Sequence, residues 1–344
     1  MNVYESDVVI VGAGIMGAAT ARALSRSGLT VNLVEQFEPG HKRGSSHGTS
    51  RIFRLSYPDP MYVAMAQEAL SLWRAAEGET GESLVLTTGG FDAGEAIENN
   101  ANALSECGAS FEMVKAADAL DRWPQVALAP DEVALWHPDA GVALADKALS
   151  NFLRVAMRAG VRVHGNTRAD SLELTEDGVA VHCEAKSFHG AVAVVTAGGW
   201  AAKLLATARV TLDVKPTRET ISYFSIAESA PTLVEWSQPS IYALPAPGFG
   251  LKAGEHIAGP ATDPEQPGEV NMDSVERISA WVARRFPGAD PTPAHAETCI
   301  YTNTPDEHFV LERHGPIVVG SPCSGHGFKF APLIGKRLAE LALG

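Results

Sequence analysis

The pattern of hydrophobic and polar positions is clearest at the start of the chain, where it predicts a strand, a helix and a second strand. Residues 7–11 (DVVIV) form an apolar, β-branched run, which is typical of a strand buried on both faces. Residues 18–27 have the composition of a helix, and residues 29–34 (LTVNLV) form a second strand-like run. This order predicts the opening unit of an α/β fold.

Three glycines join the first predicted strand to the helix. Gly12, Gly14 and Gly17 form the pattern G-x-G-x-x-G. In a dinucleotide site the first glycine permits a tight turn, the second lets the backbone approach a pyrophosphate, and the third lets helix and strand pack closely. Glu35 follows Gly12 by 23 positions, where a carboxylate accepts hydrogen bonds from the adenosine ribose. The motif predicts a Rossmann-like dinucleotide site and leaves NAD and FAD open. The alternative is a glycine turn in a ligand-free α/β unit.

The rest of the chain alternates between α/β and β-rich segments. Amphipathic helices are predicted at 62–76, 146–158 and 273–285, a polar helix at 96–107, a buried strand at 191–196, and a final helix opened by Pro332. From Thr211 the pattern is β-rich, with strands predicted at 211–215, 219–224, 240–244 and 250–253. We therefore expect a discontinuous dinucleotide domain at 1–83, 143–205 and 299–344. An α+β second domain with a β-sheet, at 84–142 and 206–298, is expected to hold the substrate.

Composition narrows the class of partner. The 344 residues include 27 Lys and Arg against 41 Asp and Glu, a net charge of −14, which argues against nucleic acid and anionic membranes. No apolar stretch is long enough to span a membrane, and the N-terminus does not resemble a signal peptide. We therefore expect a cytoplasmic protein. The four cysteines are scattered without C-x-x-C pairs, so neither a metal site nor a disulfide framework is expected.

Two arginines near residue 50 indicate an anion site. Arg51 and Arg54 lie three positions apart, so in a helix they would share one face. Two guanidinium groups held close together favour an anion between or near them. A solvated basic face, or contact with the cofactor pyrophosphate, would explain the same spacing, and the pattern alone does not decide between these readings.

Four further stretches carry a resemblance to a known family: GSSHGTSRIFR (44–54), GLKAGEH (250–256), CIYTNTPDEHF (299–309) and SGHGFKF (324–330). Together with the N-terminal motif, they resemble monomeric sarcosine oxidase and N-methyltryptophan oxidase, which are D-amino-acid-oxidase-like flavoproteins. The matches occur in the same order and span the chain. The resemblance implies FAD as the cofactor, a two-domain fold with a β-sheet substrate domain, and a monomer.

The resemblance also implies roles for individual residues. In the family, the position of Cys299 forms a thioether to the flavin, and the positions of Arg54 and Lys329 hold the substrate carboxylate. The position of Lys252 activates oxygen, and those of Tyr301 and His326 contact the reacting groups. His256 and Arg51 match polar residues near the flavin. Ser45, Gly325 and Gly327 belong to the matched stretches and are expected to contact the cofactor.

The expected activity follows from the same resemblance. It is oxidation of a secondary amine that bears a carboxylate, such as sarcosine or another N-methyl amino acid, to an imine that hydrolyses, with oxygen reduced to hydrogen peroxide. Oxidation of a cyclic or larger amino acid such as pipecolate is the nearest alternative. A dehydrogenase that uses a protein electron acceptor, and a non-catalytic FAD-binding subunit, are two others.

Overall fold

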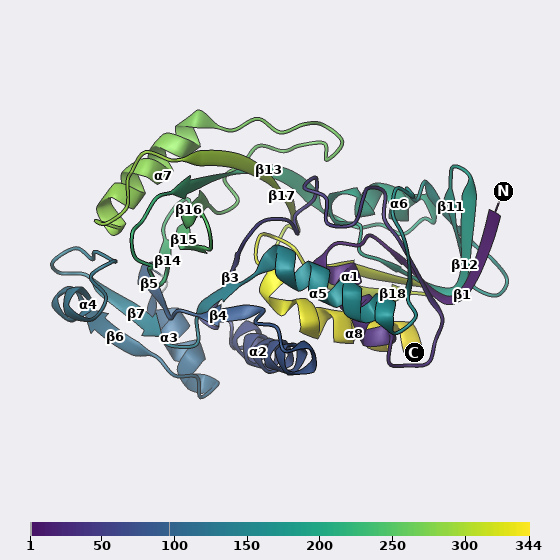
Figure 1. Cartoon of the computed structure of the whole chain (residues 1–344), viewed down its shortest axis with the longest axis horizontal. Coiled ribbons are helices and arrows are strands. Elements are labelled where there is room, and N and C mark those ends of the chain that lie inside the picture. Colours follow the sequence, from purple (N-terminus) through teal and green to yellow (C-terminus); the bar gives the residue numbers. More distant parts are fainter. Residues whose placement is uncertain (1, 96) are drawn as a thin grey trace.

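The structure is a computed structural model that describes residues 2–95 and 97–344. Figure 1 shows two groups of elements side by side, connected through the long strands β13 (Lys215–Phe224) and β17 (His295–Asn303). One group is built on a mainly parallel sheet and the other on a mainly antiparallel sheet, and a third sheet has three short strands.

The first sheet is organised around β1 (Asn2–Val11), which runs parallel to a neighbour on each side. In sheet order the strands are β10 (Ser171–Leu174), β11 (Val179–Cys183), β12 (Lys186–Val195), β1, β2 (Val31–Val34) and β9 (Arg162–His164). The second half of β12 also pairs in parallel with β19 (Ile317–Ser321), which in turn pairs with β18 (Val310–His314). The parallel centre of this sheet confirms the α/β class predicted from the opening strand–helix–strand pattern.

Helices cover both faces of the first sheet. Val8 and Ile10 of β1 belong to the core beneath α1 (Ile15–Leu24), α5 (Ala145–Arg158) and α8 (Ala331–Leu343). Val9 and Val11 face the opposite core, beneath α6 (Ala201–Thr207), because side chains alternate along a strand. Helices α1 and α8 approach closely at Gly335, where a Cβ atom would lie 2.4 Å from the carbonyl carbon of Ala19.

The second sheet forms the other group of elements in Figure 1. In sheet order its strands are β17, β13, β16 (Gly250–Glu255), β15 (Ile241–Ala246), β14 (Thr232–Trp236), β5 (Gly90–Gly94), β7 (Val133–His137) and β6 (Glu112–Lys115). Helix α7 (Met272–Arg285) packs an apolar stripe onto this sheet and is capped by the side chain of Asn271, which accepts hydrogen bonds from two backbone N–H groups. The shorter helices are α3 (Ile97–Glu106) and α4 (Ala116–Arg122).

The third sheet connects the two groups. Its strands are β3 (Arg51–Phe53), β8 (Gly141–Ala143) and β4 (Val85–Thr87), with β8 antiparallel to both of the others. Helix α2 (Pro60–Thr80) precedes β4. The helix begins after Asp59, whose side chain accepts a hydrogen bond of 2.8 Å from the Met61 backbone. It ends at Gly81, which has a φ of +71°. Glycine adopts this left-handed conformation without steric strain because it has no Cβ atom.

Several predicted elements differ from the structure. Residues 51–53 form a strand rather than a helix, because they pair with β8. Residues 211–214 lie outside any strand, and α6 and β14 were not predicted. Ala96, where the polar helix was predicted to begin, lies outside the described residues. Cys299 lies on β17 in the second sheet, although the predicted boundary placed it in the dinucleotide domain; the division into two domains otherwise stays a prediction.

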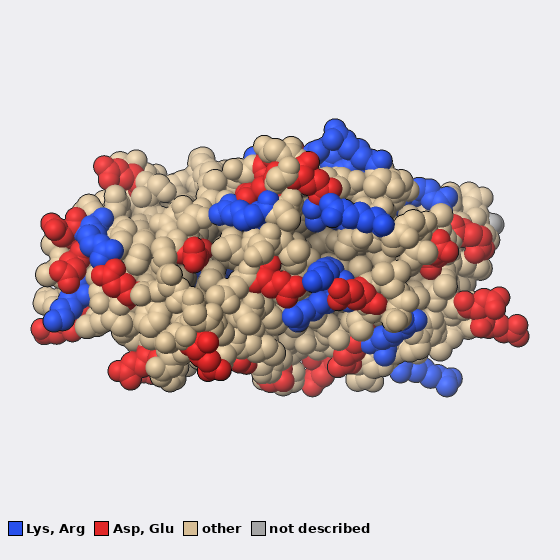
Figure 2. Space-filling view, turned by 90° about the horizontal axis from the view of Figure 1, so that it is seen from below, with Lys and Arg blue, Asp and Glu red and all other residues tan. Residues whose placement is uncertain are grey.

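The surface in Figure 2 carries acidic and basic side chains interspersed over one face of the molecule. Within residues 2–95 and 97–344, no helix has both the length and the apolar character needed to cross a membrane.

Candidate active site

A large cavity brings together the residues that the sequence motifs pointed to. Its volume is 990 Å³, and it is lined by the glycine turn after β1, the end of β2, the strand β3, and residues of β16, β17 and the 320–329 loop. Every predicted site residue except Gly17 lines it: Gly12, Gly14, Glu35, Ser45, Arg51, Arg54, Lys252, His256, Cys299, Tyr301, Gly325, His326, Gly327 and Lys329. Segments far apart in the sequence therefore share one site.

The glycine turn has the geometry that a phosphate-binding loop needs. Gly12 has a φ of +100°, and a Cβ atom there would lie 2.6 Å from the Thr196 carbonyl oxygen. A Cβ atom at Gly17 would lie 1.9 Å from the Gly12 oxygen. A side chain fits at neither position, as a tight glycine turn between strand and helix requires. The backbone N–H of Ile15, in the first turn of α1, donates to Ser46 Oγ at 3.0 Å.

Glu35 lies at the end of β2 and is buried. Its carboxylate accepts hydrogen bonds from the backbone N–H groups of Ala13 at 2.8 Å and Phe37 at 3.0 Å, and His41 Nε2 lies 3.3 Å away. The Ala13 bond ties the acid directly to the glycine turn. This places a fixed carboxylate beside the turn, as a ribose-binding acid requires.

Arg51 and Arg54 lie in different surroundings of the same cavity. Arg51 donates to the carbonyl oxygens of Ser45 at 2.8 Å, His47 at 2.6 Å and Ser50 at 2.9 Å. These bonds hold the loop before β3 in place, and Ser45 Oγ donates in addition to the Ile300 carbonyl at 2.6 Å. The interpretation that Arg51 and Arg54 hold an anion on one helix face is therefore wrong, because residues 51–53 form a strand.

Arg54 lies instead beside Lys329. The Arg54 guanidinium donates to the Ser56 carbonyl and its central carbon lies 4.2 Å from the ring centre of Tyr57. Lys329 Nζ donates to the hydroxyl of the same tyrosine, Tyr57, at 2.8 Å and to the His326 carbonyl at 2.7 Å. Both cations are buried, and burial together with Arg54 lowers the pKa of Lys329 well below its usual range. A surface role for Lys329 is excluded.

The hydrogen bonds around Tyr57 have only one consistent direction. His326 Nε2 lies 3.0 Å from the Glu307 carbonyl oxygen, which only accepts, so Nε2 carries the hydrogen. The other nitrogen, Nδ1, then accepts from the Tyr57 hydroxyl at 3.2 Å, and that hydroxyl accepts from Lys329. Burial and the charge of Lys329 lower the pKa of His326 well below 6.5, in keeping with a neutral ring. Lys329 is thereby held toward the cavity.

Lys252 is a second buried lysine, on β16. It is 2% exposed, and its Nζ donates to the Ser50 carbonyl at 3.3 Å. Burial, together with the positive charge of Arg51, lowers the pKa of Lys252 to about 7. The Lys252 amine therefore lies in the protein interior and not in solvent.

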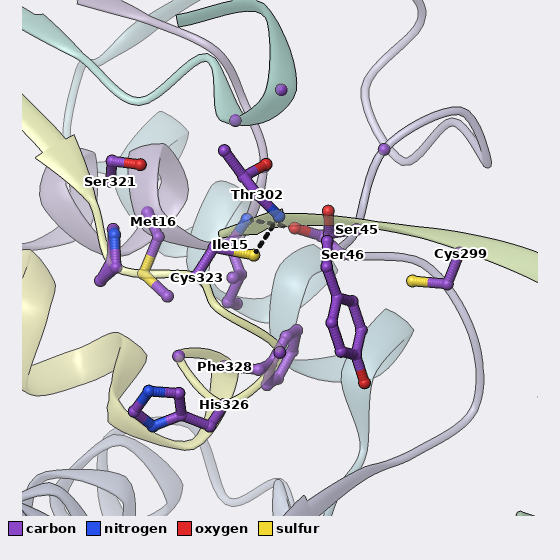
Figure 3. A pocket seen from close by; sticks show the side chains of 18 of the residues that line it. Ile15, Met16, Ser45, Ser46, Cys299, Thr302, Ser321, Cys323, His326 and Phe328 are labelled. Carbon is purple, nitrogen blue, oxygen red and sulfur yellow. Dashed lines mark hydrogen bonds between the residues drawn. The ribbon is translucent and has the colours of Figure 1, made fainter. Parts of the chain in front are cut away.

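Two cysteines line the cavity, as Figure 3 shows. Cys299 is buried on β17. Cys323 lies across the cavity in the loop before α8, where its sulfur accepts a hydrogen bond from the Thr302 backbone at 3.2 Å, and burial raises the pKa of its thiol.

Tyr301, two residues along β17 from Cys299, has its hydroxyl 3.4 Å from that of Tyr242, and burial raises the pKa of Tyr301. His256 pairs with Glu307 at 3.5 Å.

The loop before α8 is shaped by two glycines. Gly325 has a φ of +73°, and a Cβ atom there would lie 2.2 Å from the Tyr301 ring. At Gly327 a Cβ atom would lie 1.6 Å from the Pro322 oxygen. The helix itself begins at Ala331, after a single turn at 328–330, so the glycine loop leads directly to the positive end of α8.

These features fit a dinucleotide that carries a redox ring. The glycine turn and Glu35 suit the phosphates and the ribose, and the cavity continues to the buried cations and the two cysteines. Among the residues that the structure describes, no cluster of three or more His, Cys, Asp or Glu side chains is placed to bind a metal ion.

Comparison with known proteins decides the class. Residues 7–341 match the family described as FAD dependent oxidoreductase. The chain belongs to this family. The oxidoreductase is 33% identical to the peroxisomal sarcosine oxidase of Mus musculus, over 98% of this chain and 92% of that protein. It is 28% identical to the N-methyl-L-tryptophan oxidase of Salmonella dublin, over 98% and 95%.

A solved structure agrees with these matches. The FAD-dependent oxidoreductase superimposes on NikD, described as an unusual amino acid oxidase essential for nikkomycin biosynthesis, with a TM-score of 0.89 and 25% identity, over 99% of this chain and 94% of NikD. The family resemblance, the FAD dependence and the enzyme class predicted from the motifs are therefore confirmed.

Sequence reasoning missed several residues of the site in this oxidoreductase. Tyr57 and Trp236, which contact Arg54, and Tyr242, which contacts Tyr301, all line the cavity. His47 is buried near Lys252, and burial and Arg51 lower its pKa to about 4. The aromatic residues belong to no motif, and only the fold brings them to the site.

Proposed function

We propose that this enzyme oxidises a secondary amine that bears a carboxylate, sarcosine or another N-methyl amino acid, and reduces oxygen to hydrogen peroxide. The observation that carries the proposal is the pair Arg54 and Lys329. Both cations are buried beside one cavity, and among the described residues no carboxylate oxygen lies within 4.0 Å of either. In a protein of net charge −14, two such cations favour an anionic group of the substrate.

The residues of the site then have distinct tasks. Arg54 presents a planar fork of donors and Lys329 a point charge, and together they fix the carboxylate end of an amino acid. Fixing that end limits the positions that the amine can take, which lowers the entropic part of the barrier. When bound, FAD supplies the oxidising power, taking two electrons from the amine and passing them to oxygen. Lys252 places a cation where a negative charge on oxygen would be stabilised.

The carboxylate requirement is testable with purified enzyme. A panel of sarcosine, N-methyl amino acids, proline and pipecolate would be assayed for peroxide, with N-methylpropylamine as the amine that lacks a carboxylate. We expect peroxide with one or more of the amino acids and little with N-methylpropylamine. Equal turnover of N-methylpropylamine would contradict the proposal, and turnover of pipecolate alone would favour a cyclic substrate.

Substitution of the two cations gives a second prediction. Arg54→Ala or Lys329→Ala removes a charge-assisted contact worth about 1.5–3 kcal/mol, so the Kd of acetate should rise roughly 10- to 150-fold in each variant. Binding is measured from the change in the flavin absorption spectrum. The surface variant Lys336→Ala is the control, because Lys336 pairs with Glu68 on the outer side of α8. Unchanged acetate affinity in both variants would remove these residues from the site.

We propose in addition that Cys299 carries the FAD through a thioether. Such a bond would replace the thiol hydrogen of Cys299 and one hydrogen of the flavin 8α methyl group, and the two protons and two electrons released would pass to oxygen as hydrogen peroxide. Support comes from the position of Cys299, buried on β17 and lining the cavity within the stretch that resembles the family motif. Acid precipitation should leave yellow colour on the protein, Cys299→Ala should release it, and Cys323→Ala should not. Release of the colour by the parent enzyme would disprove the link.

A further inference from the structure

The guanidinium of Arg54 is held by aromatic rings rather than by a carboxylate partner. Its central carbon lies over the ring of Tyr57 at 4.2 Å and over the ring of Trp236 at 4.8 Å. Its hydrogen bond to the Ser56 carbonyl uses a single nitrogen. The direction in which its remaining donors point therefore depends on where these two rings lie.

Trp236 is fixed from behind by a buried carboxylate. Its indole Nε1 donates to Asp92 Oδ1 at 2.7 Å, and the second carboxylate oxygen, Oδ2, lies 3.1 Å from His137 Nε2. Asp92 is 0% exposed and His137 is 2% exposed. Neither residue lines the cavity, so this carboxylate does not touch the substrate directly.

The register of three adjacent strands creates this arrangement. Trp236 lies opposite Gly94 in the parallel pair β14–β5, and His137 lies opposite Gly90 in the antiparallel pair β5–β7. Asp92, between the two glycines on the same face of β5, therefore meets both side chains on the diagonals. At Gly90 and Gly94 a Cβ atom would come within 2.3 Å and 2.4 Å of β14 atoms, so only glycine fits on either side of Asp92 on this face of the strand.

A buried carboxylate is expensive to maintain, and each isolated one costs several kcal/mol in desolvation. The His137 ring 3.1 Å away, the Arg54 charge and the hydrogen bond from Trp236 nevertheless keep the pKa of Asp92 below its usual range. The structure thus contains a buried carboxylate that contacts the cavity-lining Trp236, whose ring in turn lies against Arg54.

We propose that Asp92 and His137 are positioning residues that lock Trp236, and that Trp236 in turn aims the Arg54 donors at the carboxylate of the substrate. This inference rests on the proposed function of Arg54. The ring of Trp236 supplies the surface on which the guanidinium lies, and Asp92 prevents that ring from rotating when the site is empty.

The test compares variants that separate the ring from its tether. Trp236→Phe keeps an aromatic face but loses the bond to Asp92, and Trp236→Ala loses both. Trp136→Phe is the matched control, because Trp136 lies on β7 of the same sheet, packs against Trp123 and Phe91, and does not line the cavity. The Kd of acetate is measured from the flavin spectrum, and KM and kcat are measured with the best amine of the panel.

We expect Trp236→Phe to raise the acetate Kd and the KM by about 3- to 10-fold, as the loss of one hydrogen bond implies, with kcat changed less than about twofold. Trp236→Ala should raise both more than about tenfold. Asp92→Asn, which keeps an acceptor for the indole, should lose less affinity than Asp92→Leu. Should Asp92→Leu fail to fold, the two Trp236 variants decide the question.

The inference is overturned when both Trp236 variants bind acetate as the parent does, or when Trp136→Phe loses as much affinity as Trp236→Phe. A fall in kcat equal to the rise in KM would indicate a general structural role and would overturn it as well. Arg54→Ala separates the two claims. Normal acetate binding by Arg54→Ala removes Arg54 from the carboxylate site, whereas loss of binding by Arg54→Ala together with normal binding by both Trp236 variants refutes only the positioning role.

Discussion

The burial of Lys252 on β16 predicts that the stability of the protein depends on pH. Lys252 has an ordinary pKa of 10.5, and the folded protein lowers it to about 7. Between these pH values the unfolded chain binds a proton that the folded chain does not, so stability rises with pH across this window. Below pH 7 both states are protonated and the whole cost of burying the charge is present. Above pH 10.5 the cost vanishes.

The size of this cost follows from the shift. At about 1.4 kcal/mol per pKa unit, the difference between 10.5 and about 7 corresponds to about 5 kcal/mol. Lys252→Met keeps the length and most of the volume of the side chain and removes the charge. It also removes the hydrogen bond to the Ser50 carbonyl, worth about 1 kcal/mol. We therefore expect a gain of about 4 kcal/mol in the free energy of unfolding at pH 6, decreasing toward pH 10.

Urea denaturation at pH 6 and pH 10, with equal flavin content in each variant, measures this difference. Lys336→Met is the control, because Lys336 is half-exposed and pairs with Glu68 at 2.9 Å. Its removal should change stability by less than about 1 kcal/mol. The reasoning is refuted when Lys252→Met is less stable than the parent at pH 6, or when its gain is as large at pH 10 as at pH 6.

Two further predictions concern the reaction. In stopped-flow measurements, Lys252→Met should slow reoxidation of the flavin by oxygen by roughly 10²-fold, the scale of one lost preorganised electrostatic contact. It should slow flavin reduction by the amine much less. Equal effects on both steps would exclude Lys252 as the oxygen site. Burial and the charge of Arg54 lower the pKa of Lys329, and the amine is charged only below that pKa, so the affinity for acetate should fall as pH rises. Lys329→Met should flatten this pH dependence. A parallel pH profile in parent and variant would show that another group titrates.

The parts of the structure that could be predicted from sequence are those fixed by local geometry. Gly12 and Gly17 are required by contacts within the turn and with the adjoining strand, and Glu35 follows at the end of the next strand. The expected roles of Arg54 and Lys329 came from resemblance, because residues 275 positions apart in the chain have no local pattern that joins them. Their proximity in the structure supports that expectation. The role of each in binding substrate stays a prediction, as do the monomeric state and the cytoplasmic location.

Other features depend on strand register and could not be predicted. Arg51 belongs to a strand because β8, contributed by residues 141–143, pairs with it. The contact of Trp236 with Asp92 needs the parallel pairing of β14 with β5, and β14 was not predicted at all. A one-residue shift in that pairing would turn Trp236 to the other face of the sheet.

The close contact between α1 and α8 has a consequence for how the protein is made. The glycine turn at the start of the chain is closed by Thr196, and α1 is covered by a helix that begins at Ala331 and touches it through Gly335. On the ribosome, α1 emerges before Thr196 and α8 are synthesised, so the packing around α1 is completed late. Flavin loading is therefore expected to follow the synthesis of α8, and the nascent strand–helix–strand unit, with its apolar face uncovered, is the form most in need of a chaperone.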